Sequence, residues 1–198
     1  MRRRSCSDAT RWVGRPRGAD RSASRMDGMR VSTPVGRLPA SLVIAGNAVF
    51  WPAWTALVGY AAQRTPDAHF AEDDRITRQR DFEGEGGWYR DKLRIDRWKT
   101  RLPEAGSVFG GFEKRTVAAG DRVVMQQFVV ETRRAEHAHW GMACGVALTI
   151  LWNPWWAAPA NVAVAAGSNL PCIAVQRYNR LRLRRALAAV ERRSTSRR

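Results

Sequence analysis

Two long stretches of the chain contain no Asp, Glu, Lys or Arg, and they constrain the fold more than any other feature. The first lies between Arg37 and Arg64, and the second runs from Trp140 to Gln176. A helix crosses the bilayer core, about 30 Å thick, with about 20 residues, so the first stretch fits one crossing and the second fits two short ones. The sequence therefore predicts a mainly α, multi-pass protein of the cell membrane with two or three transmembrane helices.

The first apolar segment, residues 38–63, carries Asn47 and Pro52 near its middle. Proline inside a helix removes a hydrogen bond and bends the axis, so a kinked span is the first interpretation. A cleaved signal peptide is an alternative because Gly59 and Ala61 form a small-residue pattern. A re-entrant segment is the third.

The second apolar stretch is broken by Trp-Asn-Pro-Trp-Trp at 152–156. Pro154 lacks an amide donor and restricts the residue before it, and the tryptophans are typical of an aromatic belt at a membrane interface. This break predicts a transmembrane helical hairpin over residues 137–180, with spans near 138–152 and 157–176. The later span is rich in Ala and Gly, which allow helices to approach closely in lipid.

The net charge of +16 is concentrated in the two tails. Of the 34 Lys and Arg, 10 precede the first apolar stretch, 15 lie between the stretches and 9 follow the second, while 14 of the 18 acids lie between them. Basic tails beside spans are typical of contact with anionic lipid, so we expect membrane lipid and no nucleic acid as partner. We expect disorder in residues 1–37. Met26 and Met29 lie closer to the first apolar stretch, and if either is the true start, the Arg-rich residues before it reflect a misassigned start. Residues 181–198 form the C-terminal basic tail.

A polar, membrane-associated segment, residues 64–136, separates the apolar stretches. Its clearest piece is GGWYRDKLRIDRWKTRL, residues 86–102. One helical face of that piece would be apolar, made by Trp88, Ile95, Trp98 and Leu102. Such a basic amphipathic helix is typical of one lying among lipid headgroups, and we assign Trp98 to substrate binding there. The alternative is an ordinary surface helix packed on a soluble core.

The strongest candidate for chemistry is ETRRAEHAHW, residues 131–140, where polar helix meets apolar stretch. Glu136 and His139 are three residues apart and share a helical face, so the carboxylate can orient the imidazole. An oriented histidine is suited to act as a general base near neutral pH. The alternative is a purely structural pair at the interface. Glu-x-x-His also occurs in di-iron bundles, but one copy is too few ligands, so we expect no metal.

The second candidate is SNLPCIAVQRYNR, residues 168–180. An antiparallel hairpin returns these residues to the membrane face that carries Glu136 and His139, because the two spans run in opposite directions. We assign Arg177 and Arg180 to an anionic donor and Tyr178 and Asn179 to a developing oxyanion, all as substrate-binding residues. The alternative is a basic stop-transfer anchor.

One further pattern is weak. His69 and Asp74 have the His-x4-Asp spacing of a glycerolipid acyltransferase motif. Two residues at one spacing arise easily by chance in a polar segment, so we give them no role.

Four stretches together carry a resemblance to a known family: WYRDKLRIDRWKTRLPEAG, ETRRAEHAHW, LWNPWW and NLPCIAVQRYNRLRL. They lie within about residues 64–185. The chain resembles the bacterial glycosyl-4,4'-diaponeurosporenoate acyltransferases, membrane enzymes that esterify the sugar of a glycosylated carotenoid with a fatty acid. It departs from the family pattern in its Arg-rich N-terminus and at Leu181, where the pattern has proline.

The resemblance implies an O-acyltransferase that transfers a fatty acyl group to a sugar hydroxyl of a glycosylated carotenoid or related glycolipid. On this hypothesis His139 is the base and Glu136 its orienting partner. No cofactor is implied beyond an acyl donor such as acyl-CoA, and the partners are the glycolipid and that donor. A non-catalytic membrane scaffold that binds anionic lipid or partner enzymes is the alternative.

Overall fold

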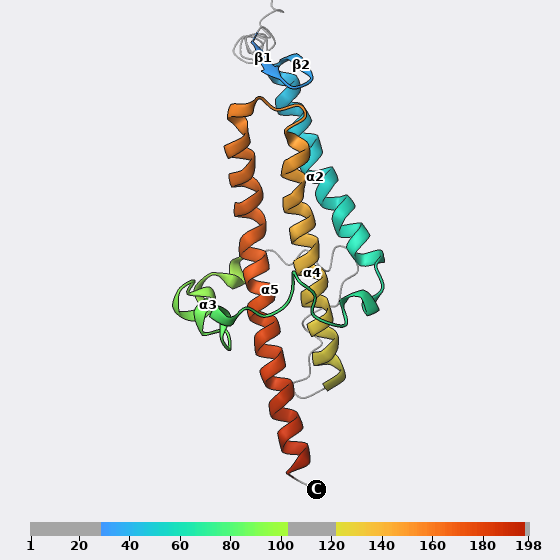
Figure 1. Cartoon of the computed structure of the whole chain (residues 1–198), viewed down its shortest axis with the longest axis vertical. Coiled ribbons are helices and arrows are strands. Elements are labelled where there is room, and N and C mark those ends of the chain that lie inside the picture. Colours follow the sequence, from blue (N-terminus) through green and yellow to red (C-terminus); the bar gives the residue numbers. More distant parts are fainter. Residues whose placement is uncertain (1–28, 103–121, 197–198) are drawn as a thin grey trace, which may run out of the picture.

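The computed structural model describes residues 29–102 and 122–196. Within them three long helices run side by side in an elongated bundle: α2 (Ala40–Arg64), α4 (Arg122–Thr149) and α5 (Ala158–Thr195) (Figure 1). Helices α4 and α5 form an antiparallel hairpin, and α2 packs against α4. The predicted mainly α class is confirmed.

Two of the described helices are long and apolar enough to cross a bilayer: α2 and the stretch Trp155–Thr195, which contains α5. The apolar window of α2 is only 11% buried, and its large side chains such as Leu42, Val49 and Leu57 point outward. A helix in the core of a soluble protein would hide these side chains, so their exposure favours contact with lipid.

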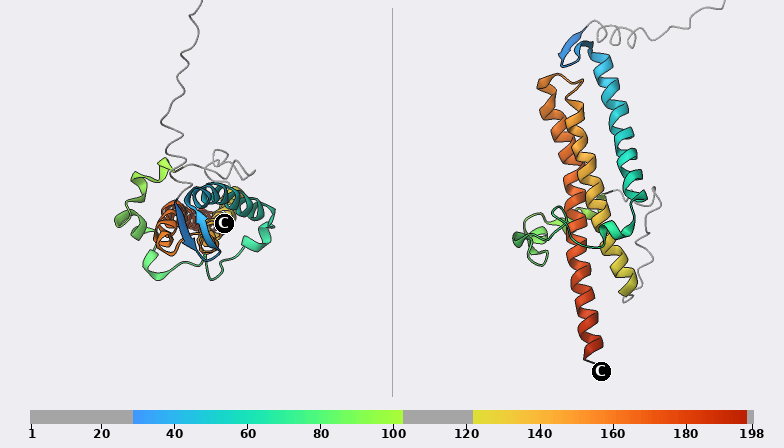
Figure 2. Two further views of the ribbon diagram at one scale, coloured as in Figure 1. Left: turned by 90° about the horizontal axis from the view of Figure 1, so that it is seen from above. Right: turned by 45° about the vertical axis from the view of Figure 1, so that its right-hand side comes forward.

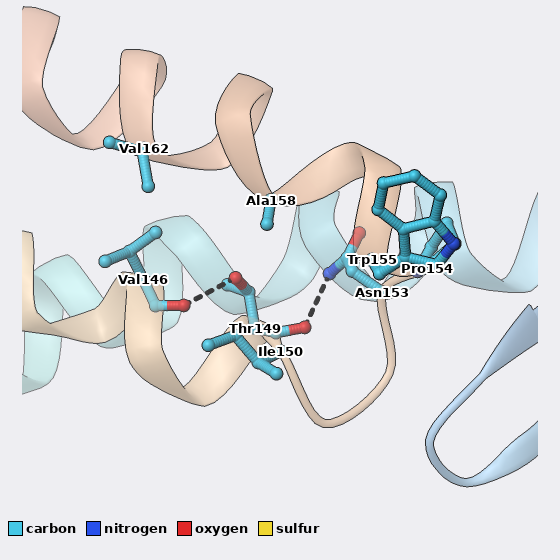
Figure 3. A pocket seen from close by; sticks show the side chains of 8 residues that line it. All are labelled: Val146, Thr149, Ile150, Asn153, Pro154, Trp155, Ala158 and Val162. Atoms are coloured by element: carbon cyan, nitrogen blue, oxygen red, sulfur yellow. Dashed lines mark hydrogen bonds between the residues drawn. The ribbon is translucent and has the colours of Figure 1, made fainter.

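The predicted break at 152–156 separates α4 from α5, with a short 3-10 turn, η7 (Trp155–Ala157), between them. At the end of α4 the Thr149 carbonyl accepts from both the backbone amide and the side-chain amide of Asn153, at 3.0 and 2.9 Å. Trp155 is 85% exposed at this tip of the hairpin. Beside it a pocket of about 80 Å³ opens between α4 and α5 (Figure 3).

Helix α2 is attached to the hairpin at two levels. Near its start the side-chain amides of Asn47 and Asn153 exchange two hydrogen bonds, 2.8 and 3.1 Å long. Further along, the Trp54 indole donates to the Gly141 carbonyl at 3.1 Å. A Cβ atom at Gly145 would overlap the Trp54 ring, so glycine is needed for this close approach. Both attachments fix the height of α2 against α4.

The prediction that residues 1–37 are disordered is wrong for the part that the structure describes. Two short antiparallel strands, β1 (Arg30–Thr33) and β2 (Gly36–Pro39), form a hairpin ahead of α2. The tight turn between them is possible because Gly36 adopts a φ of 121°, which costs glycine no steric strain. The remainder of that stretch lies outside the described residues.

The continuous interfacial helix predicted over residues 86–102 does not form. One short helix, α3 (Gly87–Asp91), is followed by two 3-10 turns, η3 (Ile95–Arg97) and η4 (Lys99–Arg101). Arg94 has a φ of 48°, a left-handed conformation that interrupts the helix.

Packing explains the interruption. The chain folds back so that its apolar residues bury against α5 instead of facing lipid. The resulting cluster comprises Tyr89, Ile95, Val175, Tyr178 and Leu181, with Leu93, Trp98, Leu102 and Ala174 partly buried against it. Of the predicted apolar face only Trp88 remains exposed. Tertiary contacts have therefore overridden the local helical pattern.

Residues 65–102, which we call the collar, run around the outside of the bundle at the level where α2 ends (Figures 1 and 2). The collar also contains two 3-10 turns, η1 (Asp67–Phe70) and η2 (Asp81–Glu83). Beyond the collar α5 continues unbroken to Thr195 beside the first half of α4. The predicted basic tail is thus helical over most of its described residues.

Candidate active site

Glu136 lies at the centre of a buried ion-pair network between α4, α5 and the collar. Its side chain is fully buried, and its two oxygens accept hydrogen bonds from Arg177 Nε and Arg180 Nη2, both at 2.6 Å. These bonds engage both carboxylate oxygens with cations of the neighbouring helix. The expected Glu136–His139 pair is therefore absent, because two arginines of α5 compete for the same carboxylate.

Both arginines reach onward to the collar. Arg177 donates to Glu83 at 2.6 Å and to the Ile76 carbonyl, and Arg180 donates to the Thr77 carbonyl at 2.8 Å. A buried charge is stable only when it is paired and hydrogen-bonded, and here the chain supplies its own partners. All three guanidinium nitrogens of Arg177 are engaged in this way, whereas Arg180 Nη1 is buried without a hydrogen-bond partner among the described residues.

Glu83 extends the network to the middle of the collar. It accepts from the Arg80 amide at 2.6 Å and from the Tyr89 hydroxyl, and its side chain is 2% exposed. Burial alone would raise the pKa of Glu83. Its hydrogen bonds from Tyr89, Arg80 and Arg177 outweigh that effect and hold the pKa below its usual value. Glu83 thus remains ionised as a counter-ion for Arg177.

His139, one turn beyond Glu136, has a different partner. Its Nδ1 lies 3.1 Å from Asn169 Oδ1 on α5. The Asn169 amide nitrogen donates to the Ala165 carbonyl at 2.9 Å, so the amide oxygen is the end that faces His139 and can only accept. Nδ1 must therefore carry the proton. In the neutral imidazole this tautomer leaves the lone pair on Nε2, and Nε2 has no partner within the described part of the chain.

A second histidine on α4 is held at both nitrogens. His137 Nδ1 lies 3.0 Å from the Arg133 carbonyl, and Nε2 lies 2.7 Å from Asp74 Oδ2. Although partial burial raises it, hydrogen bonds from Thr77 and His137 hold the pKa of Asp74 well below its usual range. Asp74 therefore pairs with His137 and not with His69, contrary to the spacing of the His-x4-Asp pattern.

The remaining predicted substrate-binding residues lie beside this network. The Tyr178 hydroxyl lies 3.2 Å from both oxygens of Asp96 and its ring is buried in the apolar cluster. Trp98 donates to the Leu93 carbonyl at 2.8 Å and is half-buried on the same cluster. Asn179 is half-buried and its side chain has no hydrogen-bond partner among the described residues. Of the predicted set, only Asn179 has a side chain that the described contacts leave unused.

The pocket at the hairpin tip lies away from the predicted site residues. It is lined by Val146, Thr149, Ile150, Asn153, Pro154, Trp155, Ala158 and Val162 (Figure 3). None of the predicted site residues is among them. Thr149 is also ten residues, or about 15 Å of helix, from His139.

No group of three His, Cys, Asp or Glu suited to a metal occurs in residues 29–102 and 122–196.

Residues 73–189 match the model of the glycosyl-4,4'-diaponeurosporenoate acyltransferase family. That match covers more than half of the chain. The chain belongs to this family. The predicted resemblance to a family of acyltransferases is thus confirmed.

Two relatives carry the family's name. One from Staphylococcus haemolyticus (strain JCSC1435) is 28% identical over 138 residues, which cover 69% of this chain and 80% of the relative. One from Staphylococcus aureus (strain bovine RF122 / ET3-1) is 26% identical over 148 residues, covering 73% and 88%. No solved structure matches the chain.

The stretch matched by the acyltransferase family contains both the ion-pair network and His139 with Asn169. It begins at Asp73, after α2 has ended, so the matched unit is the hairpin with most of its collar. The candidate chemistry of this acyltransferase therefore belongs to α4, α5 and the collar.

Asn169 is the site residue that sequence reasoning missed. A signal was present, because His139 and Asn169 each lie fifteen residues from Pro154, on opposite sides of the turn. Residues at equal distance from the tip of an antiparallel hairpin lie at the same height. The partners of the buried arginines in the collar had no comparable signal.

Proposed function

We propose that the chain is a multi-pass membrane O-acyltransferase that esterifies a sugar hydroxyl of a glycosylated carotenoid or related glycolipid with a fatty acid. Its relatives are named as acyltransferases for a glycosyl-diaponeurosporenoate. The single observation that carries the proposal is that Asn169 holds His139 Nδ1 and leaves Nε2 without a partner among the described residues. A general base must have this free nitrogen to accept a proton.

The depth of His139 in the apolar half of the bundle suits an acceptor sugar that is attached to a membrane lipid. Arg134 donates to the carbonyls of Ala62 and Thr65, at 2.6 and 2.7 Å, and so marks the height at which α2 ends. His139 is five residues further along α4, or about 7 Å deeper into the apolar half of the bundle. A sugar attached to a membrane lipid reaches this depth more readily than a free sugar, which favours a glycolipid acceptor.

In the proposed reaction His139 Nε2 removes the proton of the sugar hydroxyl as the oxygen attacks the carbonyl carbon of a fatty acyl thioester. The new C–O bond gives a tetrahedral oxyanion. Its collapse breaks the C–S bond, and the thiolate takes the proton from the imidazolium. The products are the sugar ester and a free thiol, and His139 is again neutral.

Asn179 has an uncommitted side-chain amide, but it lies ten residues along α5 from Asn169, about 15 Å, and so too far from His139 to donate to the oxyanion. Arg177 and Arg180 serve to hold the collar against the hairpin. The acyl donor, such as acyl-CoA, is the only co-substrate that this mechanism needs. The family of enzymes to which the chain belongs favours this reading over a membrane scaffold.

The test is His139→Ala in the full chain, assayed by transfer of a labelled fatty acyl group into extracted glycolipid. Loss of the base should lower the rate by about 100- to 10,000-fold. His137→Ala is the matched control, because His137 lies on the same helix but has both nitrogens engaged.

Membrane content is measured for each variant, so that lost protein is not mistaken for lost catalysis. Activity should follow His139 and not His137. Full activity of His139→Ala in intact protein would exclude His139 as the base.

A further inference from the structure

Part of the collar projects sideways from the bundle. Residues 81–101, which we call the flange, extend away from α5 at about mid-height (Figures 1 and 2). Their inner side is occupied, because Tyr89 and Ile95 are buried against Tyr178 and Leu181. The outer side has no such partner among the described residues.

Two aromatic side chains of the flange keep part of their surface exposed. Phe82 is 59% exposed and Trp88 is 36% exposed. Their rings meet edge to face, with centroids 5.2 Å apart. An exposed aromatic pair costs free energy in water, whereas aromatic rings are favoured in the headgroup layer of a membrane.

The part of the flange after Gly86 is basic, whereas residues 81–86 hold three acids, one of which, Glu83, is paired with Arg177. Residues 87–101 contain six Lys and Arg against two Asp, and one of the two, Asp96, is engaged by Lys99 and Tyr178. The exposed side chains of five of these cations have no partner among the described residues: Arg90, Lys92, Arg94, Arg97 and Arg101. Their charge is therefore available to an external anion.

The height of the flange coincides with one edge of the apolar half of the bundle. From Trp155 at the hairpin tip to Arg177 beside the flange α5 contains 22 residues of rise, about 33 Å, which matches the thickness of a bilayer core. The apolar cluster that anchors the flange includes Val175 and Leu181, on either side of Arg177. The flange thus lies where lipid headgroups would be.

We propose that the flange docks on anionic lipid headgroups, with Phe82 and Trp88 in the interfacial layer and the five unpaired cations on lipid phosphates. Aromatic rings beside basic residues at the edge of an apolar bundle are the combination that such a surface binds. This inference does not depend on the role of His139.

The test places a fluorescent probe on the flange of the full chain reconstituted in vesicles. Phe82→Cys is made in a background without the three native cysteines and labelled with an environment-sensitive dye. The vesicles contain phosphatidylcholine alone or with phosphatidylglycerol, and both carry a headgroup nitroxide quencher. Ser194→Cys, also exposed but near the far end of α5, is the control.

The expected result is strong quenching at position 82, weak quenching at position 194, and greater quenching at 82 in the anionic vesicles. Replacing the five cations by glutamine should remove that increase and leave the signal in neutral vesicles unchanged. Trp88→Cys provides a second position should Phe82→Cys fail to insert. Equal quenching at the flange and at position 194, or an anionic increase that survives the glutamine variant, would overturn the proposal.

Discussion

Glu136 and His139 lie one turn apart on the same face of α4, and the structure uses them in opposite ways. Glu136 is fully buried and both its oxygens are bound by arginines. His139 has one nitrogen bound by Asn169 and the other without a partner in the described residues. A buried carboxylate whose two oxygens both accept hydrogen bonds is typical of a residue that stabilises the fold. Catalysis needs a group that is oriented on one side and free on the other.

The largest effect should come from removing the buried acid. Glu136→Ala leaves Arg177 and Arg180 without their shared counter-ion in a buried site. Breaking a buried ion pair in this way typically costs about 3–5 kcal/mol of folding free energy. Thermal unfolding of the purified protein in detergent and its abundance in membranes should both fall.

His139→Ala is the comparison for that measurement. It should leave unfolding and abundance close to those of the original protein, because His139 makes a single hydrogen bond to Asn169. If Glu136→Ala unfolds at the same temperature as His139→Ala, the distinction between a structural acid and a free base is lost.

A smaller effect is expected at the partner of the base. Asn169→Leu removes the acceptor that fixes the Nδ1 proton of His139, so both tautomers become populated. The group that orients a metal-ligating histidine is typically worth about 10- to 100-fold in activity, and we expect a loss of similar size in kcat. Asn161→Leu is the matched control, because Asn161 lies on α5 and its described side-chain bond goes to the Ala157 carbonyl, in the turn that precedes the helix.

Asn169→Asp tests the same pair of residues through the pH dependence of the rate. A carboxylate at this position stabilises the imidazolium form of His139, which cannot accept a proton. A higher pH is then needed to generate the neutral base, so the acid limb of the pH–rate profile should move to higher pH. A profile that only loses height, with its acid limb unmoved, would show that Asn169 has a structural role.

The fold was predictable where local chemistry decides it. Uncharged stretches of sufficient length and Pro154 at the tip determine the hairpin, because hydropathy and a missing amide donor act without help from distant residues. The helix predicted over residues 86–102 does not form, for the opposite reason. Their helical pattern is real, but burial of Tyr89 and Ile95 against α5 outweighs it.

The sequence predicted which side chains lie close together in the candidate site, but not which acid pairs with which arginine. The antiparallel hairpin does bring Arg177 and Arg180 to the turn of α4 that carries Glu136. Which acid neutralises which arginine depends on the path of the collar, through Glu83 and the carbonyls of Ile76 and Thr77. That path is set by tertiary packing, which sequence spacing does not encode.

The smallest effect should come from an ion pair outside the network. Arg122 and Glu191 join the start of α4 to the end of α5, with side chains 54% and 51% exposed. Exposed pairs contribute about 0.2–1 kcal/mol and are screened by salt. A double-mutant cycle of Arg122→Ala and Glu191→Ala, followed by unfolding in detergent, should give a coupling in that range that vanishes in high salt.

The same cycle on Glu136 and Arg180, whose side chains are 0% and 3% exposed, should give a larger coupling that persists in salt because the pair is shielded from ions. Equal couplings in the two cycles would mean that burial does not set the strength of these pairs, and the structural role given to Glu136 would lose its physical basis.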